Sequence, residues 1–125
     1  MKQHEKRSAG VWLDQHHALL ITHSTIEGEG FAVTEKIASE ENHSSGSEHS
    51  MNNAKQGERI KYFKTVAHQL LNYDELLLFG PGTAQEQFLK FLQEDGQFKK
   101  TKISLDTANQ LTEPQVIARV RTFFQ

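Results

Sequence analysis

The middle of the chain holds a group of basic residues that could contact phosphate groups: Lys55, Arg59, Lys61 and Lys64. Residues 55–72 contain these four cations and one acid, so their net charge is +3, whereas the whole chain has a formal net charge of -2. Lys and Arg are the side chains that bind nucleic-acid phosphates. We expect Tyr62 to be the exposed ring beside them, and Lys99, Lys100 and Lys102 to extend the same surface. The group predicts RNA contact, with a solvated helix face as the alternative.

A Gly-Pro-Gly turn between a predicted strand and a predicted helix is the second candidate site. The sequence FGPGTAQEQF, residues 79–88, would present free backbone N–H groups and the positive end of a helix dipole at the edge of a sheet. We expect an anion to bind there at Gly80, Gly82 and Thr83. The Lys-Ser/Thr end of a P-loop and the spacing of a dinucleotide fingerprint are both missing, so a turn that only orients the helix is the alternative.

Asp14 ends the first predicted strand, where metal-dependent nucleases of the ribonuclease H-like fold place a carboxylate. Two-metal catalysis needs several carboxylates around the scissile phosphate, and Glu58 and Glu113 are the candidates to complete the set. The fourth predicted strand ends in Phe79 and Gly80 without an acid, which disfavours a nuclease. The other interpretation of Asp14 is a turn residue that bonds its own backbone.

Seven histidines among 125 residues raise the question of a metal site. The candidates are adjacent histidines in the first hairpin and a polar group further on: His16, His17, Glu41, His43, Glu48 and His49. Adjacent strand residues point in opposite directions, and the absence of Cys excludes every Cys-ligated site. We therefore expect incidental polar histidines, with no metal site, no cofactor and no catalytic residue.

The apolar pattern predicts an α/β fold with the order β-β-β-α-β-α-β-α. The three opening strands form an antiparallel meander, and crossover helices make the later strands parallel, so the sheet is mixed. Residues 39–56 are almost free of apolar side chains and are expected to form a long polar loop. The expected elements are strands at 10–14, 17–23 and 31–37, a helix at 57–71, a strand at 75–79, a helix at 84–95, a strand at 98–105 and a helix at 114–124.

Length and composition are those of one globular domain, residues 1–125. The charged N-terminus lacks the apolar core of a signal peptide, and no stretch approaches the ~20 apolar residues of a membrane span. We therefore expect a soluble, cytoplasmic protein.

The order of elements resembles the central domain of the archaeal and eukaryotic class 1 release factor and Pelota family, including its bacterial relatives. The likeness covers about residues 9–124. It includes the hairpin GVWLDQHHALLITH with Asp14 and Ala18, the basic segment RIKYFKTVAHQLL, and the strand, Gly-Pro-Gly turn and helix that lead to Phe88. The resemblance implies a fold related to ribonuclease H and to some ribosomal proteins, a translational machinery component-like fold.

Release factors of this family carry Gly-Gly-Gln in the loop after the third strand, where it enters the peptidyl transferase centre and promotes ester hydrolysis. The equivalent stretch here, SEENHSSGSEHSMNNAKQG, has only Gly46 and Gln56-Gly57. The resemblance therefore implies a stand-alone, non-catalytic accessory protein of translation that contacts RNA, with the ribosome or tRNA as partner. Two alternatives remain: a protein-interaction module that forms a homodimer through an exposed sheet edge or apolar strip, and a divergent metal-dependent nuclease.

Overall fold

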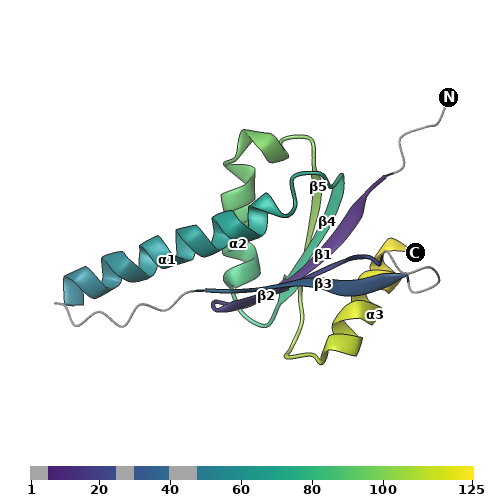
Figure 1. The fold of residues 1–125 in the computed structure, drawn as a ribbon, viewed down its shortest axis with the longest axis horizontal. Helices are drawn as coiled ribbons and strands as arrows, with labels where there is room; N and C mark the ends of the chain where they lie inside the picture. The colour runs from purple at the N-terminus through teal and green to yellow at the C-terminus, as the bar shows by residue number, and fades with distance from the viewer. Residues whose placement is uncertain (1–5, 25–29, 40–47) are drawn as a thin grey trace.

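The computed structural model describes residues 6–24, 30–39 and 48–125, with side chains in the last range from residue 57 onward. It is a small α/β fold built on one five-stranded sheet with the strand order β3-β2-β1-β4-β5 (Figure 1). The elements are β1 (Ser8–Leu13), β2 (His17–His23), β3 (Phe31–Ala38), α1 (Glu48–His68), β4 (Glu75–Gly80), α2 (Ala84–Gln93), the 3-10 helix η1 (Gly96–Phe98), β5 (Lys102–Thr107) and α3 (Glu113–Phe124).

The sheet is mixed, as expected. β2 pairs antiparallel with β1 and with β3, whereas β4 pairs parallel with β1 on one side and with β5 on the other. The four residues Leu76, Leu77, Leu78 and Phe79 are all buried, because β4 is covered on both faces. This agrees with the expectation from their uninterrupted apolar run.

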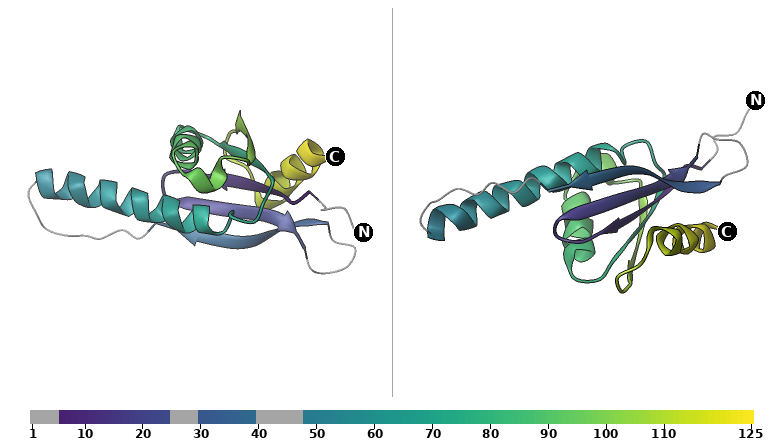
Figure 2. Two further views of the ribbon diagram at one scale, coloured as in Figure 1. Left: turned by 90° about the horizontal axis from the view of Figure 1, so that it is seen from above. Right: turned by 60° about the horizontal axis from the view of Figure 1, so that its bottom comes forward.

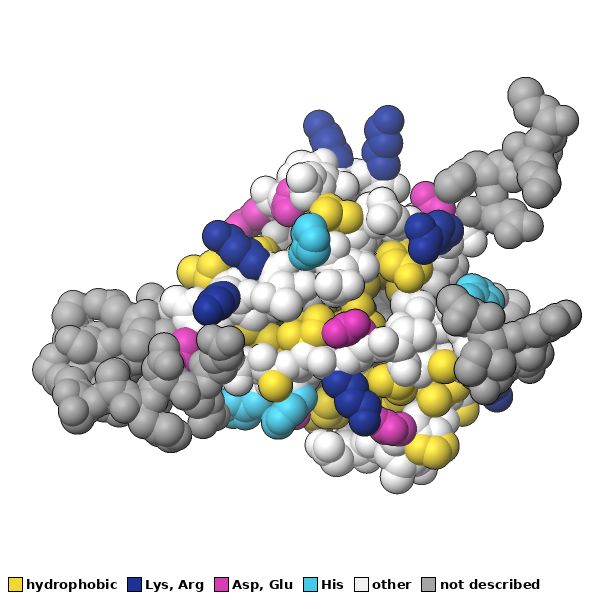
Figure 3. All heavy atoms as spheres, in the orientation of Figure 1, with side chains coloured by type: hydrophobic (Ala, Val, Ile, Leu, Met, Phe, Trp, Pro, Cys, Tyr) yellow, Lys and Arg dark blue, Asp and Glu magenta, His cyan; other side chains and the backbone are white. Residues whose placement is uncertain are grey.

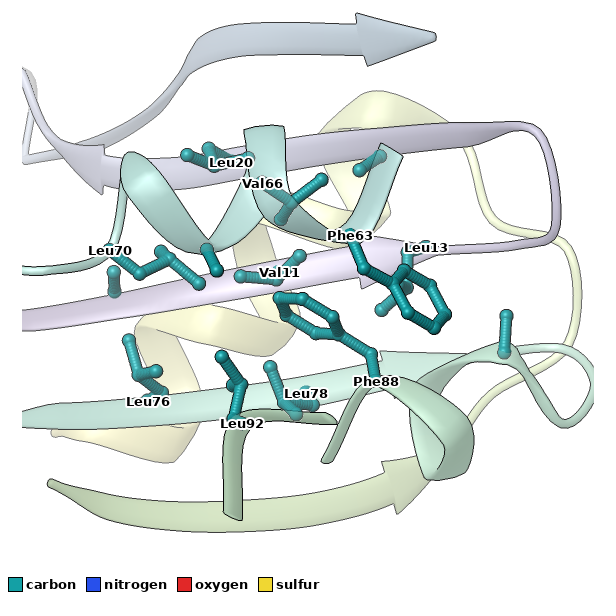
Figure 4. Packing of buried hydrophobic residues seen from close by; sticks show 14 of the residues in the cluster. Val11, Leu13, Leu20, Phe63, Val66, Leu70, Leu76, Leu78, Phe88 and Leu92 are labelled. Atoms are coloured by element: carbon teal, nitrogen blue, oxygen red, sulfur yellow. The ribbon is translucent and has the colours of Figure 1, made fainter. Parts of the chain in front are cut away.

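Helices cover both faces of the sheet, and the alternation of side chains along each strand divides the core in two (Figure 2). On β1, Val11 and Leu13 pack toward α1 and α2, whereas Trp12 packs toward α3. Figure 4 shows the larger cluster, in which Phe63 of α1 and Phe88 of α2 lie over the strands with ring centroids 5.2 Å apart. The parallel strands and the two helices above them position the candidate sites.

The first helix begins nine residues earlier than predicted, at Glu48 rather than at 57. The expectation of a loop over 39–56 was therefore wrong for residues 48–56, while residues 40–47 lie outside the described residues. Apolar periodicity failed here because this part of α1 extends past the sheet and has no core to cover (Figure 1). Backbone hydrogen bonds are enough to continue a helix, and an internal Gly57 costs only about 1 kcal/mol.

Phe98 does not belong to a strand, contrary to prediction. It lies in η1, buried beneath the end of α2, and the carboxylate of Asp95 accepts a hydrogen bond of 2.9 Å from the backbone N–H of Gln97 to start that turn. β5 begins only at Lys102. Among the described residues, no helix combines the length and the hydropathy that crossing a membrane requires.

Candidate functional site

The basic residues of α1 are exposed but do not all face the same way. Lys61 and Lys64 are three residues apart and share one flank of the helix with His68. Arg59 is two residues before Lys61, so it lies on another side of the helix. The side chain of Lys55 lies outside the described residues. Of the three predicted cations whose side chains are described, the fold places two, Lys61 and Lys64, on one flank of the helix.

Tyr62 is not the exposed ring that we expected. Only 3% of its surface is accessible, because it lies on the side of α1 that packs against the sheet. Its hydroxyl donates a hydrogen bond of 3.2 Å to the backbone oxygen of Asp14 in the β1–β2 connection. Burial, assisted by the negative charge of Asp14, raises the pKa of the Tyr62 phenol far above its usual value. The ring is a structural anchor of α1 and is not accessible for base stacking.

On the face of the molecule in Figure 3, the described cations do not form one continuous basic surface. Their side chains are scattered, with acidic and apolar side chains between them. Lys99, Lys100 and Lys102 are exposed near the start of β5, and the ammonium of Lys102 lies 4.0 Å from a carboxylate oxygen of Glu75. On this face the described cations therefore lie in small groups.

The Gly-Pro-Gly turn connects β4 to α2 as predicted and places the N-terminus of α2 beside the carboxyl ends of β1 and β4. Thr83 precedes the helix, and its side chain makes no capping hydrogen bond. The carboxylate of Glu86 lies in the first turn, where its negative charge already complements the helix dipole. Gly80 is buried at the end of β4, and the negative charge of Glu86 opposes an anion beside Gly82 and Thr83, so an anion site at these three residues stays a prediction.

Gln85 holds this turn together from inside the fold. Its side chain is fully buried, and its amide nitrogen donates to the backbone oxygens of Gly80, at 3.1 Å, and Gly82, at 2.8 Å. A Cβ atom at Gly80 would stand 2.2 Å from the backbone oxygen of Leu13 and 2.9 Å from Oε1 of Gln85. Glycine is therefore required at position 80 by close approach of the neighbouring chain segments.

Gln85 is not among the residues predicted from the sequence, although the sequence carries a signal for it. Gln85, Phe88 and Leu92 follow one another at helical spacing, and all three are buried. A polar residue on the buried stripe of a helix must find hydrogen-bonding partners inside the fold, and the carbonyl groups of the preceding turn are the nearest ones.

Asp14 is a turn residue. Its Oδ1 accepts hydrogen bonds from the backbone N–H groups of His16, at 2.8 Å, and His17, at 2.7 Å. Both imidazoles are exposed, and Nδ1 of His17 lies 3.7 Å from the Asp14 carboxylate. The carboxylate thus stabilises the β1–β2 connection, as the simpler interpretation of its position requires.

The other carboxylates proposed for a nuclease do not gather around Asp14. Glu113 begins α3, on the opposite face of the sheet from α1, and its side chain pairs with Lys36 at 2.6 Å. Glu58 lies on α1. No group of three or more metal-ligating side chains occurs among the described residues. Glu41 and His43, and the side chains of Glu48 and His49, lie outside that part of the chain.

Comparison with protein-family models finds no match, and comparison with curated protein sequences finds none. Solved structures do match. The Pelota protein of Thermoplasma acidophilum aligns with a TM-score of 0.59 at 17% identity, over 89% of this chain and 30% of that one. Archaeoglobus fulgidus Pelota aligns with a TM-score of 0.62 at 15% identity, over 95% of this chain and 32% of that one.

The chain spans about a third of the length of these two proteins. At such low identity the likeness establishes a shared fold, a small α/β unit with a mixed five-stranded sheet and three helices. It agrees with the family resemblance inferred from the order of elements.

Proposed function

We propose that this chain is a translation-associated protein that contacts ribosomal RNA or tRNA through the exposed flank of α1, without hydrolysing peptidyl-tRNA. The observation that carries the proposal is the Pelota-like fold combined with two exposed lysines, Lys61 and Lys64, on one side of its first helix. The family that the sequence resembles acts on the ribosome, and exposed lysines that share a flank can meet two phosphates of one strand.

The proposal of a non-catalytic role rests on the segment that follows β3. In release factors of the family, Gly-Gly-Gln at the equivalent place promotes ester hydrolysis. This chain has no Gly-Gly-Gln anywhere in its 125 residues. Asp14 is engaged in its own turn and Glu113 is paired with Lys36, which among the described residues favours an RNA-contacting protein over a nuclease.

Co-sedimentation of the purified protein with ribosomes tests the proposal. We expect the protein to pellet with ribosomes at low salt and to be released as salt rises, because phosphate contacts displace counterions. Lys64→Glu should weaken binding and lower the slope of log affinity against log salt by about 1 to 2, one contact being replaced by a repulsion. Lys61→Glu should act in the same direction.

Lys90 supplies the matched control. It is an exposed lysine on a helix, like Lys64, but it lies in the last turn of α2. Lys90→Glu makes the same change of charge and should leave the salt slope as it is. Equal losses for Lys64→Glu and Lys90→Glu would mean that only the net charge matters, and a protein that never pellets at low salt would refute ribosome binding.

A further inference from the structure

β5 forms an edge of the sheet and leaves part of its backbone without a strand to pair with. Within the described chain β5 pairs with β4 alone. The N–H of Lys102 donates to the oxygen of Asp74, and that of Ala108 to the oxygen of Gly80, so the even-numbered residues of β5 direct their backbone groups toward β4. The N–H and C=O groups of Ile103 and Leu105 therefore point away from the sheet.

The end of this edge is closed by local contacts. The N–H of Thr107 donates to the carboxylate of Asp106 at 2.8 Å, and the guanidinium of Arg119 reaches from α3 to donate to the oxygen of Thr107 at 3.3 Å. The open stretch is thus short and well defined. It offers two donors and two acceptors, on Ile103 and Leu105.

The open stretch is complementary to a second copy of itself. When two β5 strands run antiparallel about a two-fold axis at Ser104, Ile103 of each lies opposite Leu105 of the other, and the two residues exchange both of their outward backbone hydrogen bonds. The same register places Lys102 opposite Asp106 in both halves, which makes two pairs of opposite charge. Shifting the axis by one hydrogen-bonded step, to residue 103 or 105, loses both of these charge pairs.

The side chains of both charged residues reach solvent, since that of Lys102 is 71% exposed and that of Asp106 is 46% exposed. The Asp106 carboxylate also accepts a hydrogen bond of 2.7 Å from the Arg119 guanidinium, so in the dimer Lys102 of the second copy would join an existing ion pair. Leu105 is 40% exposed, and by its register with Leu78 it lies on the face of the sheet that α2 covers. The apolar pair with Ile103 of a second copy would bury it.

We propose that the chain forms a two-fold symmetric homodimer in which two β5 strands pair antiparallel, with Ser104 on the axis, to give one continuous ten-stranded sheet. The occupant of this edge is a second copy because hydrogen-bond direction, charge and apolar side chains agree in one register. Edge strands promote association of this kind unless they are blocked, and among the described residues the contacts that close this edge lie at its Thr107 end. The dimer does not depend on the RNA contact proposed for α1.

An engineered disulfide tests the register directly, because the chain contains no other cysteine. At Ser104 the two Cα atoms would lie about 4.5 Å apart, as in a non-hydrogen-bonded antiparallel pair, and this is within the range of a disulfide. Ser104→Cys should cross-link rapidly under mild oxidation to a species of twice 14.3 kDa. Thr107→Cys is the control, because in this register its copies lie about 20 Å apart and cross-link at the slow rate of random collision.

Charge complementation supplies a second test, which needs no engineered disulfide. Lys102→Asp and Asp106→Lys each place like charges opposite one another in the dimer, and each alone should weaken dimerisation by about tenfold or more. Mixed in equal amounts, the two variants restore both opposite-charge pairs and should form a heterodimer. Light scattering and native mass spectrometry measure the two outcomes.

A monomeric mass at the highest soluble concentration of the unmodified protein would overturn the proposal and leave the β5 edge to a strand of another protein. So would equal cross-linking of Ser104→Cys and Thr107→Cys, or failure of the charge variants to pair when mixed. Circular dichroism of each variant confirms that it is folded. Because ribosome binding is measured separately, loss of one property leaves the other standing.

Discussion

The hydroxyl of Tyr62 donates a hydrogen bond to the backbone oxygen of Asp14, 48 residues earlier in the chain. The contact joins α1 to the connection between β1 and β2. The same Asp14 holds that connection with its side chain, through the N–H groups of His16 and His17. One residue therefore shapes the first hairpin and fixes the helix that crosses the sheet.

Removing the Tyr62 hydroxyl should loosen this junction without opening a cavity. We expect Tyr62→Phe to lower the free energy of unfolding by about 0.5–1.5 kcal/mol, the usual net value of a hydrogen bond. Urea denaturation measures the change. Tyr73→Phe is the control, because Tyr73 is only partly buried and its ring, not its hydroxyl, contacts Arg7. An unchanged midpoint for Tyr62→Phe would mean that the bond contributes nothing.

The raised pKa of Tyr62 also predicts how the stability of the fold changes at alkaline pH. The unfolded chain releases this proton near pH 10, whereas the native chain keeps it, so the native state binds more protons and loses stability as pH rises above about 10. The stability advantage of the parent over Tyr62→Phe should therefore shrink between about pH 8 and about pH 10.5. Parallel urea titrations of the two proteins at the two pH values test this.

Alanine substitution at the two glycines of the β4–α2 turn should have opposite effects on stability. Gly80→Ala places a methyl group against the backbone oxygen of Leu13 and should destabilise the fold by about 1–3 kcal/mol. Gly82 has nothing within 4 Å of the equivalent position. Gly82→Ala should be neutral or stabilise by up to about 1 kcal/mol, since it restricts the unfolded chain. Equal melting temperatures for the two variants would contradict the close approach.

The stability of the fold should depend on the amide donor of Gln85. Gln85→Leu leaves the backbone oxygens of Gly80 and Gly82 without their side-chain donor, and we expect a loss of about 1–3 kcal/mol or more. Gln87→Leu, two residues along the same helix, removes only the exposed bond to Gln15 and should change stability by less than about 0.5 kcal/mol. Thermal denaturation of both variants distinguishes a buried clamp from an ordinary surface glutamine.

The role of Asp14 predicts a difference between two substitutions. Asp14→Ala removes the acceptor of two backbone N–H groups and should cost about 1 kcal/mol. Asp14→Asn keeps a carbonyl oxygen that can accept the same bonds, so it should cost less than half as much. If both variants lose equal stability, the negative charge of Asp14 contributes more than its turn geometry.

Much of the fold could be predicted because the apolar pattern reports burial. The run Leu76–Phe79 is apolar throughout since its strand is covered on both faces, and the strands β1, β2 and β3 begin and end within about two residues of the predicted bounds. The apolar pattern fails where a helix is not covered by a core, and where a buried residue lies outside a strand. The first turns of α1 are helical without a core to cover, and Phe98 is buried without lying in a strand.

The candidate site was harder to predict because it depends on the directions in which side chains and backbone groups point. Tyr62 and Phe63 are adjacent, and periodicity alone does not decide which of two neighbouring rings faces the sheet; both do. The separation of Arg59 from Lys61 around α1 follows from helical geometry once the helix is known. The complementarity of β5 to its own copy depends on which residues direct their N–H groups outward, and only the pairing with β4 settles that.

The parallel pairing of β1 with β4 has a consequence for how the chain folds. Ser8 pairs with Glu75 and Trp12 with Phe79, so the centre of the sheet joins segments more than sixty residues apart in the sequence. High contact order of this kind slows folding, because a large loop must close before the central strands can pair. During synthesis the hairpin of β1 and β2 emerges before β4, so one edge of β1 stays unpaired until β4 follows. The centre of the sheet therefore assembles only after β4 has left the ribosome.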